Sequence, residues 1–119
     1  MGTTVLIVDD HPDFRAFARV LLEAGGFEVV GEADDGASGL SAARALKPAL
    51  VLLDVQLPDI DGFAVCERLA AEEAPPVVVL TSSRDAASYR RRLGASSARG
   101  FIAKAQLSGP ALTAFADAE

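Results

Sequence analysis

The 119-residue chain has few of the residues that build disulfide and zinc sites. It contains one cysteine, Cys66, one histidine, His11, and no tryptophan. A single cysteine excludes an internal disulfide and a cysteine-rich zinc centre. The sequence has no run of about 18 apolar residues, which argues against a transmembrane helix. Asp9 and Asp10 interrupt the first apolar segment, so we expect no signal peptide and a cytoplasmic location.

Basic residues are too few for a nucleic-acid-binding surface, since the formal net charge is −6. The charge is also unevenly distributed. Residues 84–104 hold six basic residues and one acid, whereas the rest of the chain holds five basic residues and sixteen acids. We therefore expect one basic face on an acidic body, and no direct binding of nucleic acid.

Strand-like and helix-like segments alternate five times along the chain. Apolar runs predict strands at 4–8, 27–32, 49–53, 77–80 and 101–103, and the mixed polarity of 27–32 favours an edge position. Helical periodicity and breaker residues predict helices at 12–24, 36–46, 63–73 and 84–93, and a last helix that begins at 109. This alternation predicts one α/β domain with a mostly parallel, doubly wound sheet and helices on both faces.

Polar side chains stand at the predicted carboxyl ends of the strands, where ligands of such sheets bind. They are Asp9 and Asp10 after the first strand, Asp54 after the third, Thr81 after the fourth and Lys104 after the fifth. Three converging carboxylates repel one another unless a cation is present, and oxygen ligands favour a hard ion such as Mg²⁺. A hydroxyl and an ammonium group facing that ion would complete a receptacle for a phosphoryl group, with one carboxylate as nucleophile.

Four segments carry these residues: VLIVDDHPDF, LVLLDVQLPDIDG, VVVLTSS and GFIAK. In this order, each at a strand end, they resemble the receiver domains of bacterial two-component response regulators over essentially the whole chain. The early DDHP and a lysine not followed by proline are similar to the NarL/FixJ subfamily. The resemblance implies a flavodoxin-like (βα)5 fold with strand order 2-1-3-4-5. We expect residues 1–119 to be one receiver domain, with no output domain in this chain.

The resemblance also implies a role for each site residue. Asp54 would be the phospho-acceptor, with Thr81 and Lys104 contacting the phosphoryl oxygens. Phe101 stands at the aromatic switch position of the family, although an aromatic on a short strand can equally serve only as core. The remaining implied roles are Mg²⁺ binding by Asp9, Asp10, Asp54 and the backbone carbonyl of Gln56, and control of phosphoryl lifetime by the side chains of Gln56 and Ser83.

By the same resemblance, the phosphoryl donor would be a sensor histidine kinase or a phosphotransfer protein. The face formed by the fourth helix, fifth strand and fifth helix would then control an output domain or a downstream protein, and phosphorylation can produce a homodimer. Catalysis would be confined to the domain's own phosphorylation and dephosphorylation, so we do not expect an enzyme. We also expect no membrane partner.

Other classes of protein remain as alternatives. A degenerate receiver acting as a phosphorylation-independent binding module would lack the acceptor, an acid or the lysine, and none of these is missing here. A dinucleotide or flavin oxidoreductase needs a phosphate-binding loop after the first strand, where Asp9 and Asp10 would repel a phosphate. A metal-dependent phosphohydrolase usually places its two acids two residues apart. We assign His11 only to the turn before Pro12, because Mg²⁺ prefers oxygen, and Cys66 to the core.

Overall fold

Five parallel strands form one sheet in the order β2-β1-β3-β4-β5. The computed structural model describes residues 2–116, and its strands are β1 (Thr4–Val8), β2 (Glu28–Ala33), β3 (Leu50–Asp54), β4 (Val77–Ser82) and β5 (Gly100–Ala103). β2 lies at one edge, with only two of its six residues buried. Both the strand order and the edge position of β2 are therefore as predicted.

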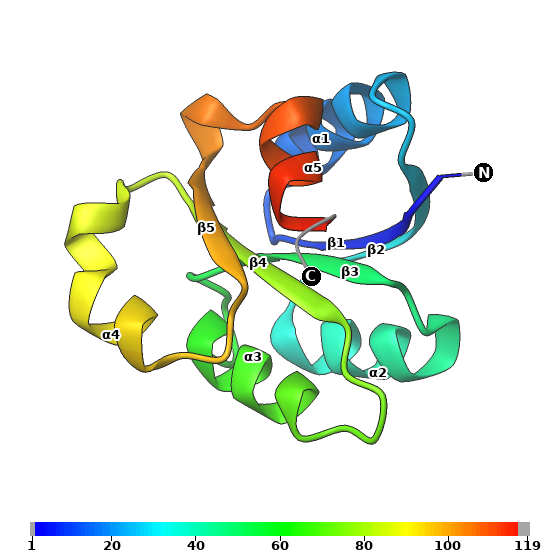
Figure 1. Ribbon diagram of the computed structural model, residues 1–119. Coiled ribbons are helices and arrows are strands. Elements are labelled where there is room, and N and C mark those ends of the chain that lie inside the picture. The colour runs from blue at the N-terminus through cyan, green and yellow to red at the C-terminus, as the bar shows by residue number, and fades with distance from the viewer. Residues whose placement is uncertain (1, 117–119) are drawn as a thin grey trace.

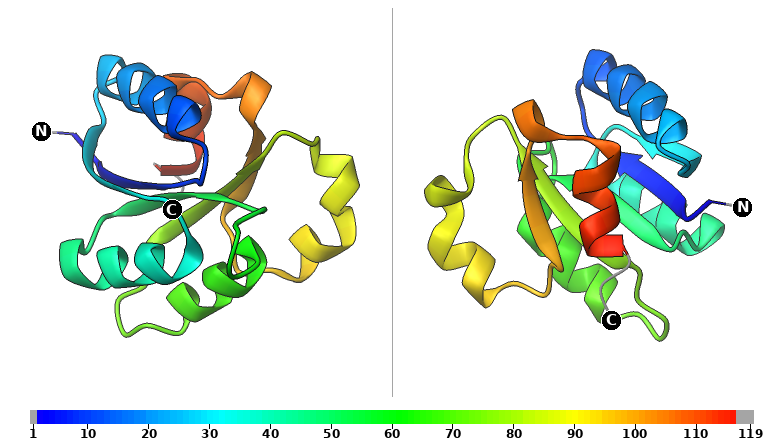
Figure 2. Two further views of the ribbon diagram at one scale, coloured as in Figure 1. Left: turned by 180° about the vertical axis from the view of Figure 1, so that it is seen from behind. Right: turned by 45° about the horizontal axis from the view of Figure 1, so that its top comes forward.

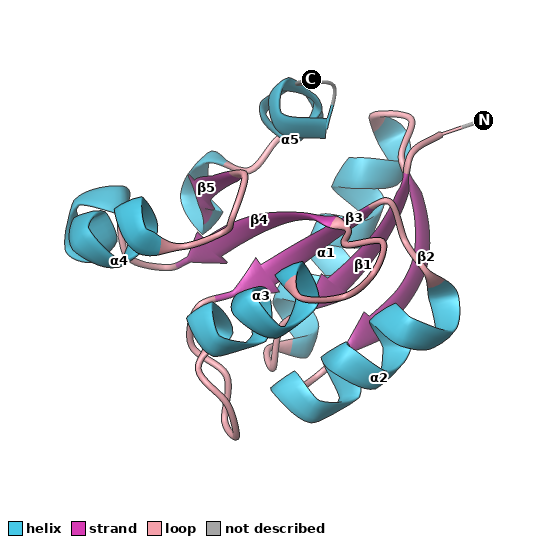
Figure 3. Ribbon diagram, turned by 60° about the horizontal axis from the view of Figure 1, so that its bottom comes forward, coloured by secondary structure: helices cyan, strands magenta, loops and turns pink. Residues whose placement is uncertain are grey.

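Helices cover both faces of this sheet, as the doubly wound prediction requires. α1 (Pro12–Ala24) and α5 (Gly109–Ala116) lie on one face, and α2 (Gly36–Leu46) and α3 (Gly62–Ala70) lie on the other (Figure 1). The short α4 (Arg90–Ala95) lies to the side of the sheet, outside β5. Figure 2 shows this position of α4 from two further directions. Figure 3 brings the α2–α3 face forward. Two 3₁₀ turns complete the chain, η1 (Ala86–Tyr89) and η2 (Lys104–Gln106).

Side chains of the inner strands point alternately into two apolar cores, one on each face of the sheet. On β1, Leu6 and Val8 belong to the core beneath α2 and α3, whereas Val5 and Ile7 belong to the core beneath α1 and α5. All four of these side chains are at most 1% exposed. Burial on both faces of the sheet explains why the sequence of β1 is a continuous apolar run and does not alternate between apolar and polar residues.

Local sequence signals set most of the helix ends. Pro12 begins α1, where no partner is needed for its missing N–H. Asp35 and Asp61 are the N-caps of α2 and α3, and their side chains accept hydrogen bonds from the amides of Ser38 (2.8 Å) and Phe63 (2.7 Å). After α1 the chain turns at Gly26, whose φ of 94° favours glycine.

Two predicted helices are corrected by the structure. The segment 84–93 is not one helix: Asp85 caps the 3₁₀ turn η1, and α4 begins only at Arg90. A short polar side chain that bonds to the local backbone competes with helix propagation, and here it starts the tighter turn instead. The helix predicted over 63–73 ends at Ala70, because the chain must leave helical geometry before Pro75 and Pro76.

Strand order reverses between β1 and β3, and this point places the candidate site. Val8 pairs with Leu53 across these two strands, and Asp54 pairs with Thr81 on β4. The residues that follow β1, β3 and β4 therefore meet at one edge of the sheet. Within residues 2–116, no helix is long and apolar enough to cross a membrane.

Candidate functional site

Three carboxylates reach the point of strand reversal from the ends of β1 and β3. Asp9 is fully buried, and Asp54 is 2% exposed. The side chain of Asp10 is 35% exposed. One ligand atom from each of these residues and from His11 lies within 4.8 Å of the others. The structure thus brings together the three acids that the strand ends predicted, and adds an imidazole to them.

Lys104 supplies positive charge to this cluster. Its Nζ lies 2.7 Å from Asp9 Oδ2 and 3.3 Å from Asp54 Oδ2, and 4.5 Å from the centroid of the Phe14 ring. Burial lowers the pKa of Lys104, but the two carboxylates raise it by more, so its pKa lies above the ordinary value of 10.5. Lys104 therefore stays charged at neutral pH and offsets part of the negative charge buried beside it.

The Asp54 carboxyl has a pKa well above its ordinary value. Burial raises its pKa to about 6, and the nearby charge of Asp9 adds to this effect. The Gln56 amide, which donates to Asp54 Oδ1 at 3.1 Å, and the Lys104 ammonium act in the opposite direction. A divalent cation bound beside Asp54 would favour its ionised form, which is the nucleophilic one.

The donor atoms of the cluster fit a magnesium ion. Among residues 2–116, the buried side-chain oxygens that accept no hydrogen bond are Asp9 Oδ2 and Asp10 Oδ1, although each has a nitrogen within ion-pair distance. A carboxylate oxygen has two lone pairs, so each of these oxygens can face a cation as well as its nitrogen partner. Mg²⁺ prefers such oxygen ligands and retains several waters, so a partly open acidic pocket suits it.

Thr81 lies opposite Asp54 but does not bond to it. Its side chain is fully buried, and Oγ1 donates a hydrogen bond of 2.6 Å to the carbonyl oxygen of Ile102 on β5. Phe101, also on β5, is half-buried and packs against Tyr89 with ring centroids 5.9 Å apart. Phe101, the predicted switch residue, therefore lies next to Ile102, whose carbonyl oxygen accepts the hydrogen bond from Thr81.

The side chains of Gln56 and Ser83 are both exposed. They lie two residues beyond Asp54 and Thr81, at the end of the sheet where the acids and Lys104 gather. Both remain accessible to water at this edge. The backbone amide of Gln56 also donates a hydrogen bond to Asp54 Oδ1.

The sequence did not predict the contacts that hold η1 and α4 in place. Tyr89 is buried, and its Oη lies 3.0 Å from Ser82 Oγ at the end of β4. On α4, Arg92 forms an ion pair of 2.8 Å with Asp61, and its guanidinium carbon lies 4.2 Å from the centroid of the Phe63 ring. Tyr89 is the chain's one tyrosine and lies in an otherwise polar segment, and this feature of the sequence could have indicated a buried contact here.

His11 also departs from its expected role. Its Nδ1 lies 3.1 Å from Asp9 Oδ1 and 3.1 Å from Asp10 Oδ1, while its backbone amide donates to Asp9 Oδ1 at 2.8 Å. The ring makes no capping hydrogen bond to α1. His11 is therefore part of the acidic cluster, and does more than precede Pro12.

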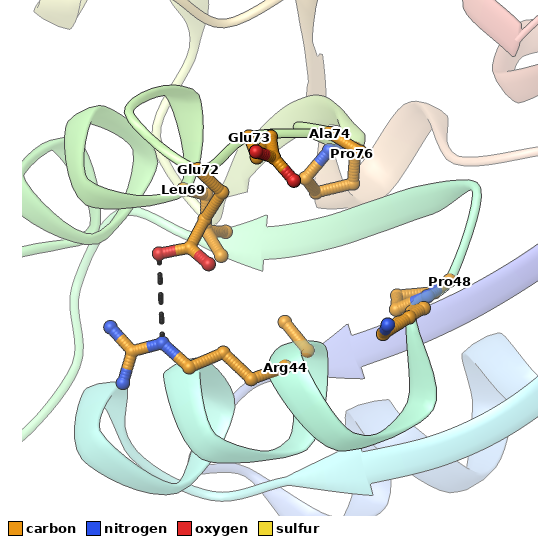
Figure 4. Close-up of a pocket in the computed structure, with 9 residues that line it drawn as sticks. Arg44, Pro48, Leu69, Glu72, Glu73, Ala74 and Pro76 are labelled. Carbon is orange, nitrogen blue, oxygen red and sulfur yellow. Dashed lines mark ion pairs between the residues drawn. The ribbon is translucent and has the colours of Figure 1, made fainter.

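A hollow of about 320 Å³ lies at the opposite end of the strands, between α2 and the end of α3 (Figure 4). Pro48 and Pro76, which precede β3 and β4, line it, and an ion pair of 3.6 Å joins Arg44 and Glu72 across it. The carboxylate cluster lies at the carboxyl ends of the same strands. This hollow is therefore separate from the candidate site.

A doubly wound parallel sheet with carboxylates and a lysine at its switch point is the arrangement of a signal receiver. The family model of the response regulator receiver domain matches residues 5–114. The chain belongs to this family.

Known relatives show how this domain occurs in longer proteins. The chain is 43% identical over 104 residues to the virulence transcription regulator BvgA of Bordetella pertussis, covering 87% of this chain and 50% of BvgA. It is 42% identical over 88 residues to a protein-glutamate methylesterase of Anaeromyxobacter dehalogenans, covering 72% of this chain and 26% of that protein. The receiver domain of the response regulator NarL from Mycobacterium tuberculosis superposes with a TM-score of 0.86 at 32% identity, covering 98% of both chains. The chain thus spans about half the length of BvgA, and less of the methylesterase.

Proposed function

We propose that this chain is a phosphorylation-controlled switch of a two-component system, and that Asp54 is the residue phosphorylated. The observation that carries the proposal is the position of the buried Asp54 carboxylate, 3.3 Å from the Lys104 ammonium and beside the carboxylates of Asp9 and Asp10. A carboxylate so placed can accept a phosphoryl group whose charge is shared between a cation and a lysine.

The donor in this proposal is a phosphohistidine of a sensor kinase or phosphotransfer protein in the cytoplasm. An Asp54 oxygen attacks phosphorus as the bond from phosphorus to the imidazole nitrogen breaks, and the imidazole leaves with that bond's electron pair. Lys104 pairs with the phosphoryl oxygens as negative charge reaches the site. Asp9, Asp10, Asp54 and the Gln56 carbonyl would hold Mg²⁺, and that ion would supply further neutralisation of the negative charge.

Phosphorylation would next alter the contacts of β5. Thr81 would exchange its hydrogen bond to Ile102 for one to the phosphoryl group, which carries about −1.5 to −2 charges at pH 7. Phe101 would then move into the space that Thr81 leaves. The face formed by α4, β5 and α5 changes shape as a result and controls an output domain, a downstream protein or a homodimer.

The chemistry proposed is limited to the domain's own phosphorylation and dephosphorylation. The exposed side chains of Gln56 and Ser83 stand where water would approach the aspartyl phosphate, and we propose that they help to set its lifetime. Exchange of both for apolar residues should change the decay rate of the phosphorylated form. An unchanged rate would remove these two side chains from the mechanism.

The test of the proposed function is the intact mass of the protein after incubation with acetyl phosphate and Mg²⁺. We expect one phosphoryl adduct, absent with a chelator and absent in Asp54→Asn. The matched control is Asp13→Asn, because Asp13 is an exposed acid in the first turn of α1 and should label like the unmodified chain. No adduct in protein shown to be folded would contradict the proposal and favour the phosphorylation-independent binding module.

A further inference from the structure

We propose that Asp59 is a positioning residue for the phosphoryl-transfer site, because it holds the loop that follows Asp54 against the first turn of α2. The loop comprises residues 55–61, between β3 and α3, and it carries the main chain of Gln56 beside the acceptor. Asp59 touches no reacting atom in this proposal and acts through Gln56. The inference deepens the proposed function and rests on it.

The Asp59 carboxylate accepts hydrogen bonds from three backbone amides. Oδ1 accepts from Gly36 at 2.7 Å and from the neighbouring Ile60 at 2.8 Å. Oδ2 accepts from Ala37 at 2.9 Å. The bonds from Gly36 and Ala37 hold the pKa of Asp59 below its ordinary value, so the carboxylate is charged at neutral pH. Asp59 thus satisfies two first-turn amides that have no partner within α2, in a segment 23 residues earlier in the chain.

Close packing accompanies these hydrogen bonds. Gly36 is buried, and a Cβ added to it would lie 2.9 Å from Ile60 Cβ and 3.1 Å from Val65 Cγ2 on α3. Such distances leave no space for a side chain, so the start of α2 lies directly against the loop and against α3. The Asp59 side chain itself is exposed, and its replacement would leave no cavity in the core.

The base of the loop is held separately, at the sheet. The Val55 amide donates to the carbonyl oxygen of Thr81 at 2.9 Å, and the Val55 carbonyl oxygen accepts from the Gly62 amide at 2.8 Å. A Cβ added to Gly62 would lie 2.7 Å from Val55 Cα, so α3 begins in contact with this base. The loop is therefore held at two points, Val55 at the sheet and Asp59 at α2.

Gln56 lies between these two points. Three residues separate them, and the last of the three, Pro58, restricts the residue before it to extended backbone. A displacement of Asp59 would therefore be transmitted to Gln56. The Gln56 amide donates to Asp54 Oδ1 at 3.1 Å, and its carbonyl oxygen is the proposed Mg²⁺ ligand. Loss of the bonds between Asp59 and α2 should weaken both contacts of Gln56.

Asp35 provides a matched control for Asp59→Ala. It is the N-cap of the same helix, and its carboxylate accepts hydrogen bonds from the amide and the hydroxyl of Ser38, at 2.8 and 2.6 Å, and not from the loop. Asp35→Ala and Asp59→Ala each remove one negative charge and one carboxylate that caps α2. Both variants should therefore lower Tm, and only the second should release the loop.

Two measurements on the whole chain separate positioning from stability: the NMR signal of the Gln56 amide in metal-free protein, and the affinity for Mg²⁺ by calorimetry. We expect Asp59→Ala to shift the Gln56 signal and to weaken Mg²⁺ binding by at least about tenfold, the lower end of what loss of an outer-shell partner costs. Asp35→Ala should change neither. Asp59→Asn keeps one acceptor oxygen for Gly36, so it should weaken Mg²⁺ binding by less, and it serves for the same comparison if the alanine variant does not fold.

An unmoved Gln56 signal and an unchanged Mg²⁺ affinity in folded Asp59→Ala would overturn the positioning role. Equal losses in Asp35→Ala would also overturn it, because they would show that the stability of α2 alone is responsible. Neither result bears on phosphorylation of Asp54, which the intact mass measures. Absence of the phosphoryl adduct, with the effects of Asp59→Ala as expected, would instead overturn the proposed function and leave the role of Asp59 in holding the loop.

Discussion

Replacement of Asp54 by asparagine should stabilise the metal-free protein at neutral pH. Burial raises the pKa of Asp54 from its ordinary 3.8 to about 6, so the folded chain disfavours the ionised carboxylate. This difference corresponds to about 3 kcal/mol as an upper bound. Water near the partly open cluster screens the effect, so we expect the free energy of unfolding to rise by about 1–3 kcal/mol. Asparagine keeps an oxygen for the Gln56 amide but carries no charge, and Lys104 keeps its ion pair with Asp9.

The contribution of Asp54 to the free energy of unfolding should depend on pH. Because the pKa of Asp54 is higher in the folded than in the unfolded chain, the folded chain binds more protons between about pH 4 and pH 6. The contribution of Asp54 to stability therefore falls as the pH rises through this window, and stays low above it. Asp54→Asn should lack this fall, so the two proteins should differ most at pH 7 and above.

Thermal unfolding followed by circular dichroism, in a chelating buffer from pH 5 to pH 7.5, measures both effects. The expected rise at the highest pH is roughly 4 to 12 °C in Tm. Asp13→Asn, at an exposed position, should leave Tm and its pH dependence nearly unchanged. A Tm of Asp54→Asn equal to or below that of the unmodified chain at pH 7.5 would refute the reasoning about the buried charge.

Three further perturbations test the site and its surroundings. Mg²⁺ at ten times its Kd should stabilise the fold by about 1.4 kcal/mol, and Asp9→Asn should reduce that gain in the same thermal assay; an equal gain in both proteins would exclude Asp9 as a ligand. Tyr89→Phe removes the hydroxyl that lies 3.0 Å from Ser82, and should lower the free energy of unfolding in urea by about 1 kcal/mol, whereas an unchanged value would mean that this bond contributes nothing to stability. Gly62→Ala places a Cβ against the backbone at the end of β3 and should destabilise the fold by about 1–3 kcal/mol, while Gly94→Ala, with nothing within 4 Å, should not; similar effects for both would contradict the close approach.

The fold and the acids of the site follow from local sequence patterns. The aliphatic runs of β1 and β3 have no helical spacing, and each is followed at once by an aspartate, so both the strands and the meeting of Asp9 with Asp54 could be predicted. The sheet order needed the family resemblance, because alternation of strands and helices does not by itself determine which strands are neighbours.

Contacts between distant side chains could not be predicted in this way. Nothing local indicates that Thr81 bonds to the carbonyl of Ile102, or that Arg92 pairs with Asp61, since each pair is brought together by tertiary packing. The segment 84–93 was misassigned because Asp85 can either lie within a helix or cap a shorter turn, and the burial of Tyr89 accompanies the second. The position of the His11 ring likewise depends on the acids that the fold places beside it.

The central claim is that Asp54 carries the phosphoryl group, and reduction of the phosphorylated protein with borohydride tests it most directly. Borohydride reduces an aspartyl phosphate to an alcohol, and peptide mass spectrometry then locates the reduced residue. The account predicts one reduced position, Asp54, in protein treated with acetyl phosphate and Mg²⁺, and none when Mg²⁺ is withheld. Reduction at Asp9 or Asp10 instead, with Asp54 intact, would contradict it.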